Sequence, residues 1–191
     1  MAVRFNFPLF LTWCRIVAIP LFVAVLYIPE DWVALRLANV ISMWIFIAAA
    51  VTDWLDGYLA RRWNQTTSFG AFLDPVADKL MVAAALIVLT EKQLVDPFAS
   101  LIIIGREITV SALREWMAHI GQSKSVAVNV LGKLKTVSQL VAIPFLLYNG
   151  HLFAIDTNTV GRWLIWVAAI LTLWSMVVYL KAAVAAPPGK N

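Results

Sequence analysis

Long apolar stretches dominate this 191-residue chain and restrict the folds open to it. Six of them follow one another, separated by short polar breaks, at residues 8–28, 33–61, 70–89, 98–117, 134–148 and 160–180. Hydrophobic residues make up 62% of the chain and its mean hydropathy is +0.82, which is more apolar surface than a soluble domain of this length buries. A bilayer solvates such side chains, and a helix satisfies its own backbone there. The sequence therefore predicts an all-α integral membrane protein, a bundle of six transmembrane helices.

The placement of positive charge predicts how this bundle faces. An even number of spans puts both chain ends on the same side of the membrane. Most of the 15 Lys and Arg residues fall at the chain ends, in the second and fourth breaks, and at the adjoining helix ends. Because Lys and Arg accumulate on the cytoplasmic side, we expect both termini in the cytoplasm. We expect residues 1–186 to form a single membrane domain and residues 187–191 to be a short disordered tail.

Several classes of protein lack support in the sequence. Cys14 is the only cysteine, and His119 and His151 lie far apart, so neither a disulfide nor a zinc site is expected. No P-loop and no glycine-rich dinucleotide loop occurs, which leaves kinases and oxidoreductases without a motif. The positive-inside bias accounts for the basic pI, so we expect no nucleic-acid partner.

Four aspartates interrupt two neighbouring apolar stretches. Asp53 and Asp56 lie in the second stretch, and Asp74 and Asp78 lie in the third. At about 100° per residue, each pair falls on one face of its helix. The polar break at residues 64–68 lies midway between the pairs and closes an antiparallel helix hairpin, which brings both pairs to a similar depth. The sequence therefore predicts one cluster of four carboxylates.

Such a cluster needs a positive partner, because carboxylates in a place of low dielectric constant repel one another. Arg61 and Lys79 supply too little charge for four acids. Divalent cations are the natural partners, and a set of oxygen ligands favours Mg²⁺ or Mn²⁺ over zinc or copper. Because Mg²⁺ commonly completes its shell with phosphate oxygens of a substrate, the cluster favours phosphoryl-type chemistry.

Each aspartate also has a simpler interpretation. Asp74 before Pro75 is compatible with a helix N-cap. Asp53 and Asp56 are compatible with a cation or proton pathway in a transporter. Asp78 is compatible with a neutral pair with Lys79. None of these interpretations predicts the spacing of all four aspartates.

The sequence around these aspartates resembles a known family. The pattern Asp-x2-Asp-Gly-x2-Ala-Arg-x8-Gly-x3-Asp-x3-Asp is similar to the signature of the CDP-alcohol phosphatidyltransferases, and this chain fills every position. Those positions are Asp53, Asp56, Gly57, Ala60, Arg61, Gly70, Asp74 and Asp78. Stretches at 11–15, 105–108, 111–116 and 132–136 resemble most the bacterial members whose acceptor is glycerol 3-phosphate.

The resemblance implies roles for the signature residues. All four aspartates would hold two Mg²⁺ or Mn²⁺ ions, and Asp78 would also act as the general base toward the acceptor hydroxyl. The CDP-activated lipid, CDP-diacylglycerol, would be bound by a set of residues from the signature and the first span: Gly57, Ala60, Arg61, Gly70, Thr12 and Arg15. For Arg15, a snorkelling arginine at the membrane surface is the simpler alternative.

A doubly charged acceptor such as glycerol 3-phosphate needs a basic pocket. The candidates are Arg106, Arg114, Lys133 and Lys135, with Glu107 and Glu115 as partners that would orient them. The simpler interpretation is that these cations set the topology and touch anionic lipids.

The cluster of four aspartates does not identify the acceptor alcohol, so inositol phosphate, serine and phosphatidylglycerol remain open as alternatives. The resemblance also implies membrane lipids as surroundings, a homodimer, and a bacterial inner membrane with the active site toward the cytoplasm.

Overall fold

The computed structural model describes residues 7–63, 67–119 and 130–184, which form six helices and one short ribbon. The elements are α1 (Phe7–Leu26), α2 (Leu35–Trp63), α3 (Ser68–Glu91), α4 (Pro97–His119), α5 (Val130–Tyr148), β1 (His151–Leu152), β2 (Ile155–Asp156) and α6 (Thr157–Val184). The all-α prediction is confirmed, although the antiparallel β1–β2 ribbon was not foreseen. The predicted tail at 187–191 lies outside the described residues.

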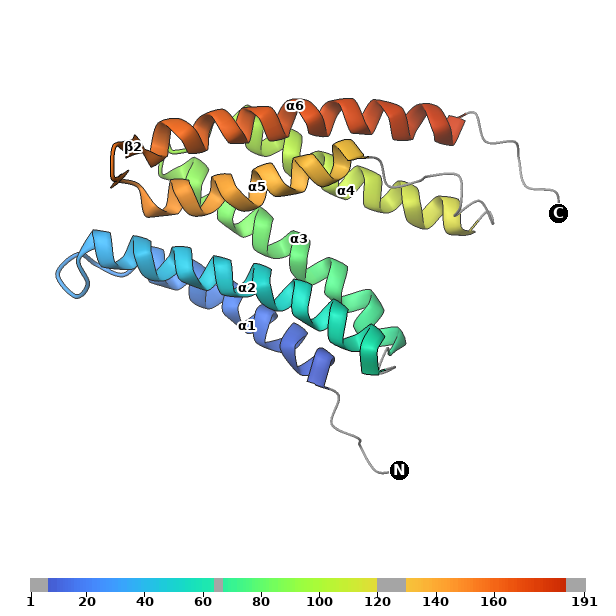
Figure 1. Ribbon diagram of the computed structural model, residues 1–191, viewed down its shortest axis with the longest axis horizontal. Helices are drawn as coiled ribbons and strands as arrows, with labels where there is room; N and C mark the ends of the chain where they lie inside the picture. The colour runs from blue at the N-terminus through green and yellow to red at the C-terminus, as the bar shows by residue number, and fades with distance from the viewer. Residues whose placement is uncertain (1–6, 64–66, 120–129, 185–191) are drawn as a thin grey trace.

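The helices run along the long axis of the molecule and alternate in direction (Figure 1). The hairpin of α1 and α2 forms one half of the bundle, and α4, α5 and α6 form the other, while α3 runs obliquely between them. Contacts between α2 and α5 also join the two halves. One end of the bundle contains the start of α1, the end of α2, the start of α3 and the end of α6 (Figure 1).

A continuous apolar core holds the halves together. Phe22 of α1, Phe46 of α2, Leu86 of α3 and Leu146 of α5 are all fully or almost fully buried in it. Gly161 permits the close approach of α6 to α5, because a Cβ at this position would lie 2.6 Å from Cγ of Leu146. Helices with small residues at their contacts pack closely in this way.

The outer surface is also apolar, as expected of a protein in a bilayer. Trp163, Leu101 and Ile87, for example, are each at least 60% exposed. Among the described residues, three helices are long and apolar enough to span a membrane by length and composition: Leu9–Leu26, Leu35–Leu59 and Thr157–Lys181. Charged residues lower the hydropathy of α3 and α4, and the apolar part of α5 is shorter, Leu134–Tyr148.

Local capping decides where two of the helices begin. Thr67 caps α3, with its Oγ1 accepting a hydrogen bond from the Gly70 backbone N–H at 3.0 Å. Asp74 therefore lies inside α3, and its interpretation as an N-cap is wrong. At α6, the Asp156 carboxylate accepts hydrogen bonds from the backbone N–H groups of Asn158 and Thr159. The Thr159 hydroxyl also donates to Asp156 and, as the largest influence, holds the pKa of that carboxyl below its ordinary value.

Candidate active site

The two aspartates of α2 are bound by one arginine from α1. Arg15 Nη1 donates to Asp53 Oδ1 and Arg15 Nη2 donates to Asp56 Oδ2, both at 2.6 Å. Arg15 and Asp56 are each 2% exposed, so this is a buried ion pair. The simpler interpretation of Arg15 as a snorkelling side chain is therefore wrong. Its planar guanidinium bridges two carboxylates one helical turn apart.

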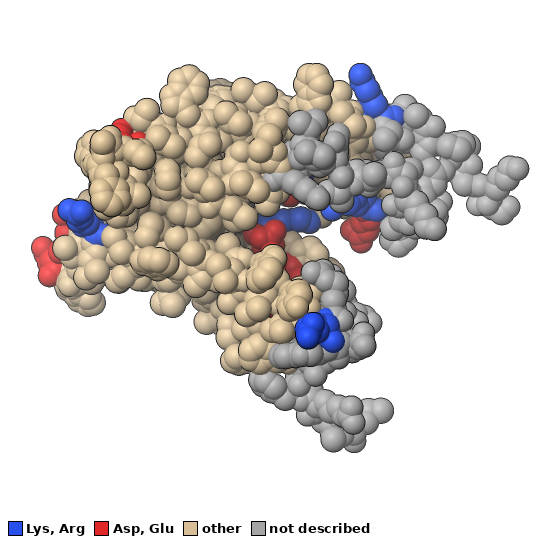
Figure 2. Space-filling model, viewed as in Figure 1, with Lys and Arg blue, Asp and Glu red and all other residues tan. Residues whose placement is uncertain are grey.

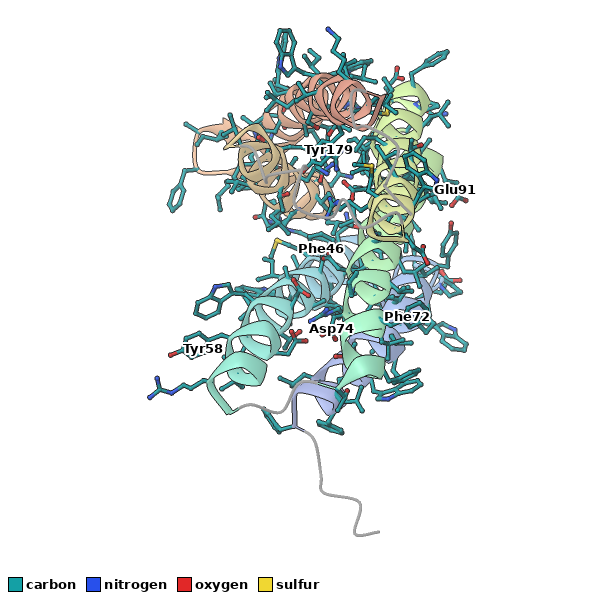
Figure 3. The ribbon with its side chains drawn as sticks, turned by 90° about the vertical axis from the view of Figure 1, so that its right-hand side faces the viewer. Phe46, Tyr58, Phe72, Asp74, Glu91 and Tyr179 are labelled. Atoms are coloured by element: carbon teal, nitrogen blue, oxygen red, sulfur yellow. The ribbon has the colours of Figure 1, made fainter. Side chains whose placement is uncertain are left out.

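The same face of α1 also binds the first aspartate of α3. Thr12 Oγ1 donates to Asp74 Oδ1 at 2.5 Å, and Thr12 is buried. Because Thr12 and Arg15 are one turn apart, a single face of α1 contacts aspartates of both α2 and α3. Asp74 points inward among these three helices, whereas Tyr58 and Phe72 point away from the bundle (Figure 3). The structure thus brings together the residues that the sequence placed on separate spans.

Asp78 and Asp53 face a common cavity of about 120 Å³ between α2, α3, α4 and α5. The space-filling view shows charged side chains of both signs gathered in a hollow between the halves, within a surface that is otherwise largely uncharged (Figure 2). Glu107, Lys135 and Lys79 line the same cavity. Lys79 Nζ donates to Ser111 Oγ on α4. The pair of Asp78 with Lys79 considered from the sequence is not among the ion pairs of the described residues.

A network of charges lines the α4–α5 side of the cavity. Glu107 forms ion pairs with Lys135 Nζ and, at 3.2 Å, with Arg106 Nη1. Arg106 is 5% exposed and also donates to Ser175 Oγ of α6 at 3.0 Å. The expected role of Glu107 as an orienting partner thus matches its contacts. Lys135 lines the cavity, whereas Arg106 is not among the described residues that line it.

Arg114 lies farther along α4 and is exposed. Its Cζ is 5.8 Å from the centre of the Tyr179 ring, and Cζ of Arg106 is 5.7 Å from the same ring. Figure 3 shows Tyr179 between α6 and α4. The Tyr179 ring is therefore within cation–π range of two of the predicted acceptor-binding cations.

The glycines of the signature differ in surroundings. Gly57 follows Asp56 on α2 and is partly exposed. At Gly70, a Cβ would lie 2.9 Å from Thr67 Oγ1, so the lack of a side chain there serves the cap of α3. The side chains of Ala60, Arg61 and Lys133 lie outside the described part of the structure, so their predicted roles stay predictions.

The oxygen atoms of these carboxylates are suitable ligands for a hard divalent cation. Their present positions, however, do not form a metal site among the described residues. As the described side chains stand, no three His, Cys, Asp or Glu residues are grouped to hold a metal ion. Arg15 already binds one oxygen of Asp53 and one of Asp56. Asp56 nevertheless interacts electrostatically with Asp53 and Asp74, and Asp78 with Asp53, so negative charge accumulates at the site. An all-oxygen donor set of this kind suits Mg²⁺ or Mn²⁺.

Comparison with known proteins identifies the family. A family model described as CDP-alcohol phosphatidyltransferase matches residues 5–174. The chain belongs to the CDP-alcohol phosphatidyltransferase family. This match includes the whole signature and all six predicted spans except the end of the last one.

Relatives of this CDP-alcohol phosphatidyltransferase cover nearly its full length. Proteins from Salmonella typhimurium and Escherichia coli are 50% identical to it over 184 residues, which is 94% of this chain and 96% of each relative. Both are named CDP-diacylglycerol–glycerol-3-phosphate 3-phosphatidyltransferase. The resemblance of this chain to the family, first noted in its signature, is therefore confirmed.

Sequence reasoning missed two contributors to the site. Gln139 lines the cavity one turn after Lys135, and Ser175 of α6 binds Arg106. The i to i+4 spacing from Lys135 to Gln139 inside an apolar stretch was the available signal. For Ser175 the sequence offers none, since small hydroxyl residues are common in membrane helices.

Proposed function

We propose that this protein transfers the phosphatidyl group of CDP-diacylglycerol to the sn-1 hydroxyl of glycerol 3-phosphate, giving phosphatidylglycerol phosphate and CMP. The observation that carries the proposal is the convergence of the signature aspartates of α2 and α3 beside a pocket that contains Lys135. The names of the relatives agree with this reaction.

Two Mg²⁺ or Mn²⁺ ions would be held by the four signature aspartates, Asp53, Asp56, Asp74 and Asp78. Bound ions would neutralise the diphosphate of the CDP-lipid and stabilise charge on the departing CMP. Arg15 is the protein's own counter-charge for two of these carboxylates. Its guanidinium holds one oxygen of Asp53 and one oxygen of Asp56, across one turn of α2.

Asp78 is suited to act as the base. It is exposed to the cavity, and it has no ion pair among those of the described residues, so its carboxylate is available to a bound ligand. The acceptor hydroxyl gives its proton to Asp78 while its oxygen attacks the phosphorus on the lipid side. A new P–O bond forms, and the bond from that phosphorus to the oxygen of CMP breaks. Positioning of the hydroxyl supplies most of the advantage that a weakly basic carboxylate lacks.

The acceptor phosphate would lie on the basic side of the cavity, toward Lys135, with Arg106, Arg114 and Lys133 adding positive charge. Glu107 offsets part of that charge and keeps Lys135 and Arg106 in place through its two ion pairs. Thr12, Gly57, Ala60, Arg61 and Gly70 would complete the CDP-lipid side.

We further propose that all six helices span the inner membrane of a bacterium, with both termini and the active site toward the cytoplasm. The alternating helix directions support six crossings (Figure 1). Several of the charges that lower the hydropathy of α3 and α4, among them Asp78 and Glu107, line the cavity between the helices. The chain would act as a homodimer, as the resemblance implies.

CMP release from purified protein tests the reaction. The protein is given CDP-diacylglycerol, Mg²⁺ and, in separate reactions, glycerol 3-phosphate, serine, inositol phosphate or phosphatidylglycerol. We expect release with glycerol 3-phosphate and its loss after chelation with EDTA. CMP release only with an acceptor other than glycerol 3-phosphate would refute glycerol 3-phosphate as the substrate. Undiminished CMP release with EDTA would refute the role of the metal. Ion flux in proteoliposomes without CMP release would favour a transporter instead.

A further inference from the structure

A buried amide donor faces the cavity beside the aspartates. Gln139 of α5 is only 5% exposed, and its Nε2 has no hydrogen-bond partner among the described residues. Gln139 also lines the cavity of about 120 Å³ that contains Asp53 and Asp78. A buried N–H without a partner is unfavourable, so such groups usually have a ligand or water to bind.

The neighbours of Gln139 in the cavity carry charges of both signs. Lys135 lies one turn earlier on α5, and it shares the single carboxylate of Glu107 with Arg106, so these three groups leave the α4–α5 side with net positive charge. Asp53 and Asp78 supply negative charge from α2 and α3, while Lys79 of α3 donates to Ser111 Oγ on α4. The amide of Gln139 and the hydroxyl of Thr136 are the uncharged polar groups of the described lining, and the other lining residues are charged or apolar.

An uncharged donor matches an uncharged oxygen. A phosphate is matched by the lysine, and the reacting hydroxyl must direct its proton to Asp78. Glycerol 3-phosphate carries one further oxygen, the hydroxyl on the carbon next to the reacting one. This neutral group is the natural acceptor for Gln139 Nε2.

We propose that Gln139 is a specificity-determining residue, whose Nε2 donates a hydrogen bond to the non-reacting hydroxyl of a phosphorylated polyol acceptor. This inference rests on the proposed function and adds to it the feature by which the site selects its acceptor. A site that presents a buried donor discriminates against an analogue lacking the matching oxygen, because the donor is then left unpaired.

The test pairs a variant with a substrate analogue. Gln139→Met keeps the length of the side chain and removes the donor. The analogue is 3-hydroxypropyl phosphate, which has the reacting hydroxyl and the phosphate of glycerol 3-phosphate but no hydroxyl between them. Release of CMP by the purified full chain with CDP-diacylglycerol and Mg²⁺ gives kcat and KM for both acceptors. Ser138→Ala is the matched control, since its buried hydroxyl donates within α5, to Leu134 O.

We expect wild-type enzyme to prefer glycerol 3-phosphate in kcat/KM by about tenfold, which corresponds to about 1.4 kcal/mol. Gln139→Met should lose this preference through a higher KM for glycerol 3-phosphate, while its KM for the analogue stays the same. Ser138→Ala should keep the preference. Because the preference is a ratio measured on one preparation, it does not depend on how much of the variant folds.

Three results would overturn the inference. The first is a wild-type enzyme that does not prefer glycerol 3-phosphate over the analogue. The second is a Gln139→Met enzyme that keeps the wild-type preference. The third is a Gln139→Met enzyme whose kcat/KM falls by the same factor for both acceptors. Absence of turnover by wild type with either acceptor would instead show that the proposed function itself is wrong.

Discussion

Removal of the guanidinium of Arg15 should destabilise the protein strongly. Arg15→Met preserves the apolar part of the side chain but leaves Asp56, which is 2% exposed, without its cation. Asp53, whose side chain is 39% exposed, loses the same partner but keeps access to water. The penalty therefore comes mainly from one buried carboxylate.

The magnitude follows from that burial. Breaking a buried ion pair by removing one partner typically destabilises a protein by about 3–5 kcal/mol. At about 2–4 °C per kcal/mol for a chain of this size, the lower figure predicts a fall in Tm of about 6–12 °C. Because the charge left behind causes the loss, Arg15→Met/Asp56→Asn should regain part of it.

Thermal unfolding in detergent micelles with EDTA, followed by the fluorescence of the nine tryptophans, measures these changes. Chelation keeps added cations from replacing the guanidinium. Arg162→Met serves as the matched control, because Arg162 is exposed and donates to Gln93 O at 3.1 Å. Its Tm should change by less than about 2 °C. An unchanged Tm for Arg15→Met, or a double variant no more stable than the single one, would refute the reasoning.

The remaining predictions concern the base, the packing of α6 and its cap. Asp78→Asn should lower kcat for CMP release by about 10²–10⁴-fold, with Tm within a few degrees of wild type; normal turnover would exclude Asp78 as the base. Gly161→Leu should destabilise the protein by more than about 1–3 kcal/mol, seen in thermal unfolding, because even a Cβ would lie 2.6 Å from Leu146 Cγ. Asp156→Ala should lower Tm at neutral pH. The pKa of Asp156 is lowered in the folded state, so its contribution is present above the unfolded value and is lost as pH falls through the folded one. The difference in Tm between wild type and Asp156→Ala should therefore shrink in acid, and a constant difference would contradict the role of the charge.

Helix positions were predictable because apolar length is a local property. The stretch expected at residues 98–117 corresponds to α4 at Pro97–His119. At the starts of α3 and α6, the difference from the expected boundary came from a cap. The sixth helix was expected from residue 160 but begins at Thr157, because Asp156 accepts hydrogen bonds from its first turn. The start of α3 was likewise set by Thr67, two residues before the expected position.

The sequence by itself determined that this chain is an all-α membrane protein and that four aspartates occupy one face of each of two adjacent helices. The first conclusion depends on the length of the apolar stretches and the second on helical periodicity, and both are properties of one element that need no knowledge of its neighbours.

Only the tertiary structure decided which groups meet across elements. It placed Arg15 between Asp53 and Asp56, paired Lys135 with Glu107, and gave the cavity-lining amide nitrogen of Gln139 no partner among the residues that the structure describes. Such meetings depend on how each helix is rotated about its axis and how closely its neighbours approach. Packing fixes both, through contacts such as that of Gly161 with Leu146, between residues far apart in the chain.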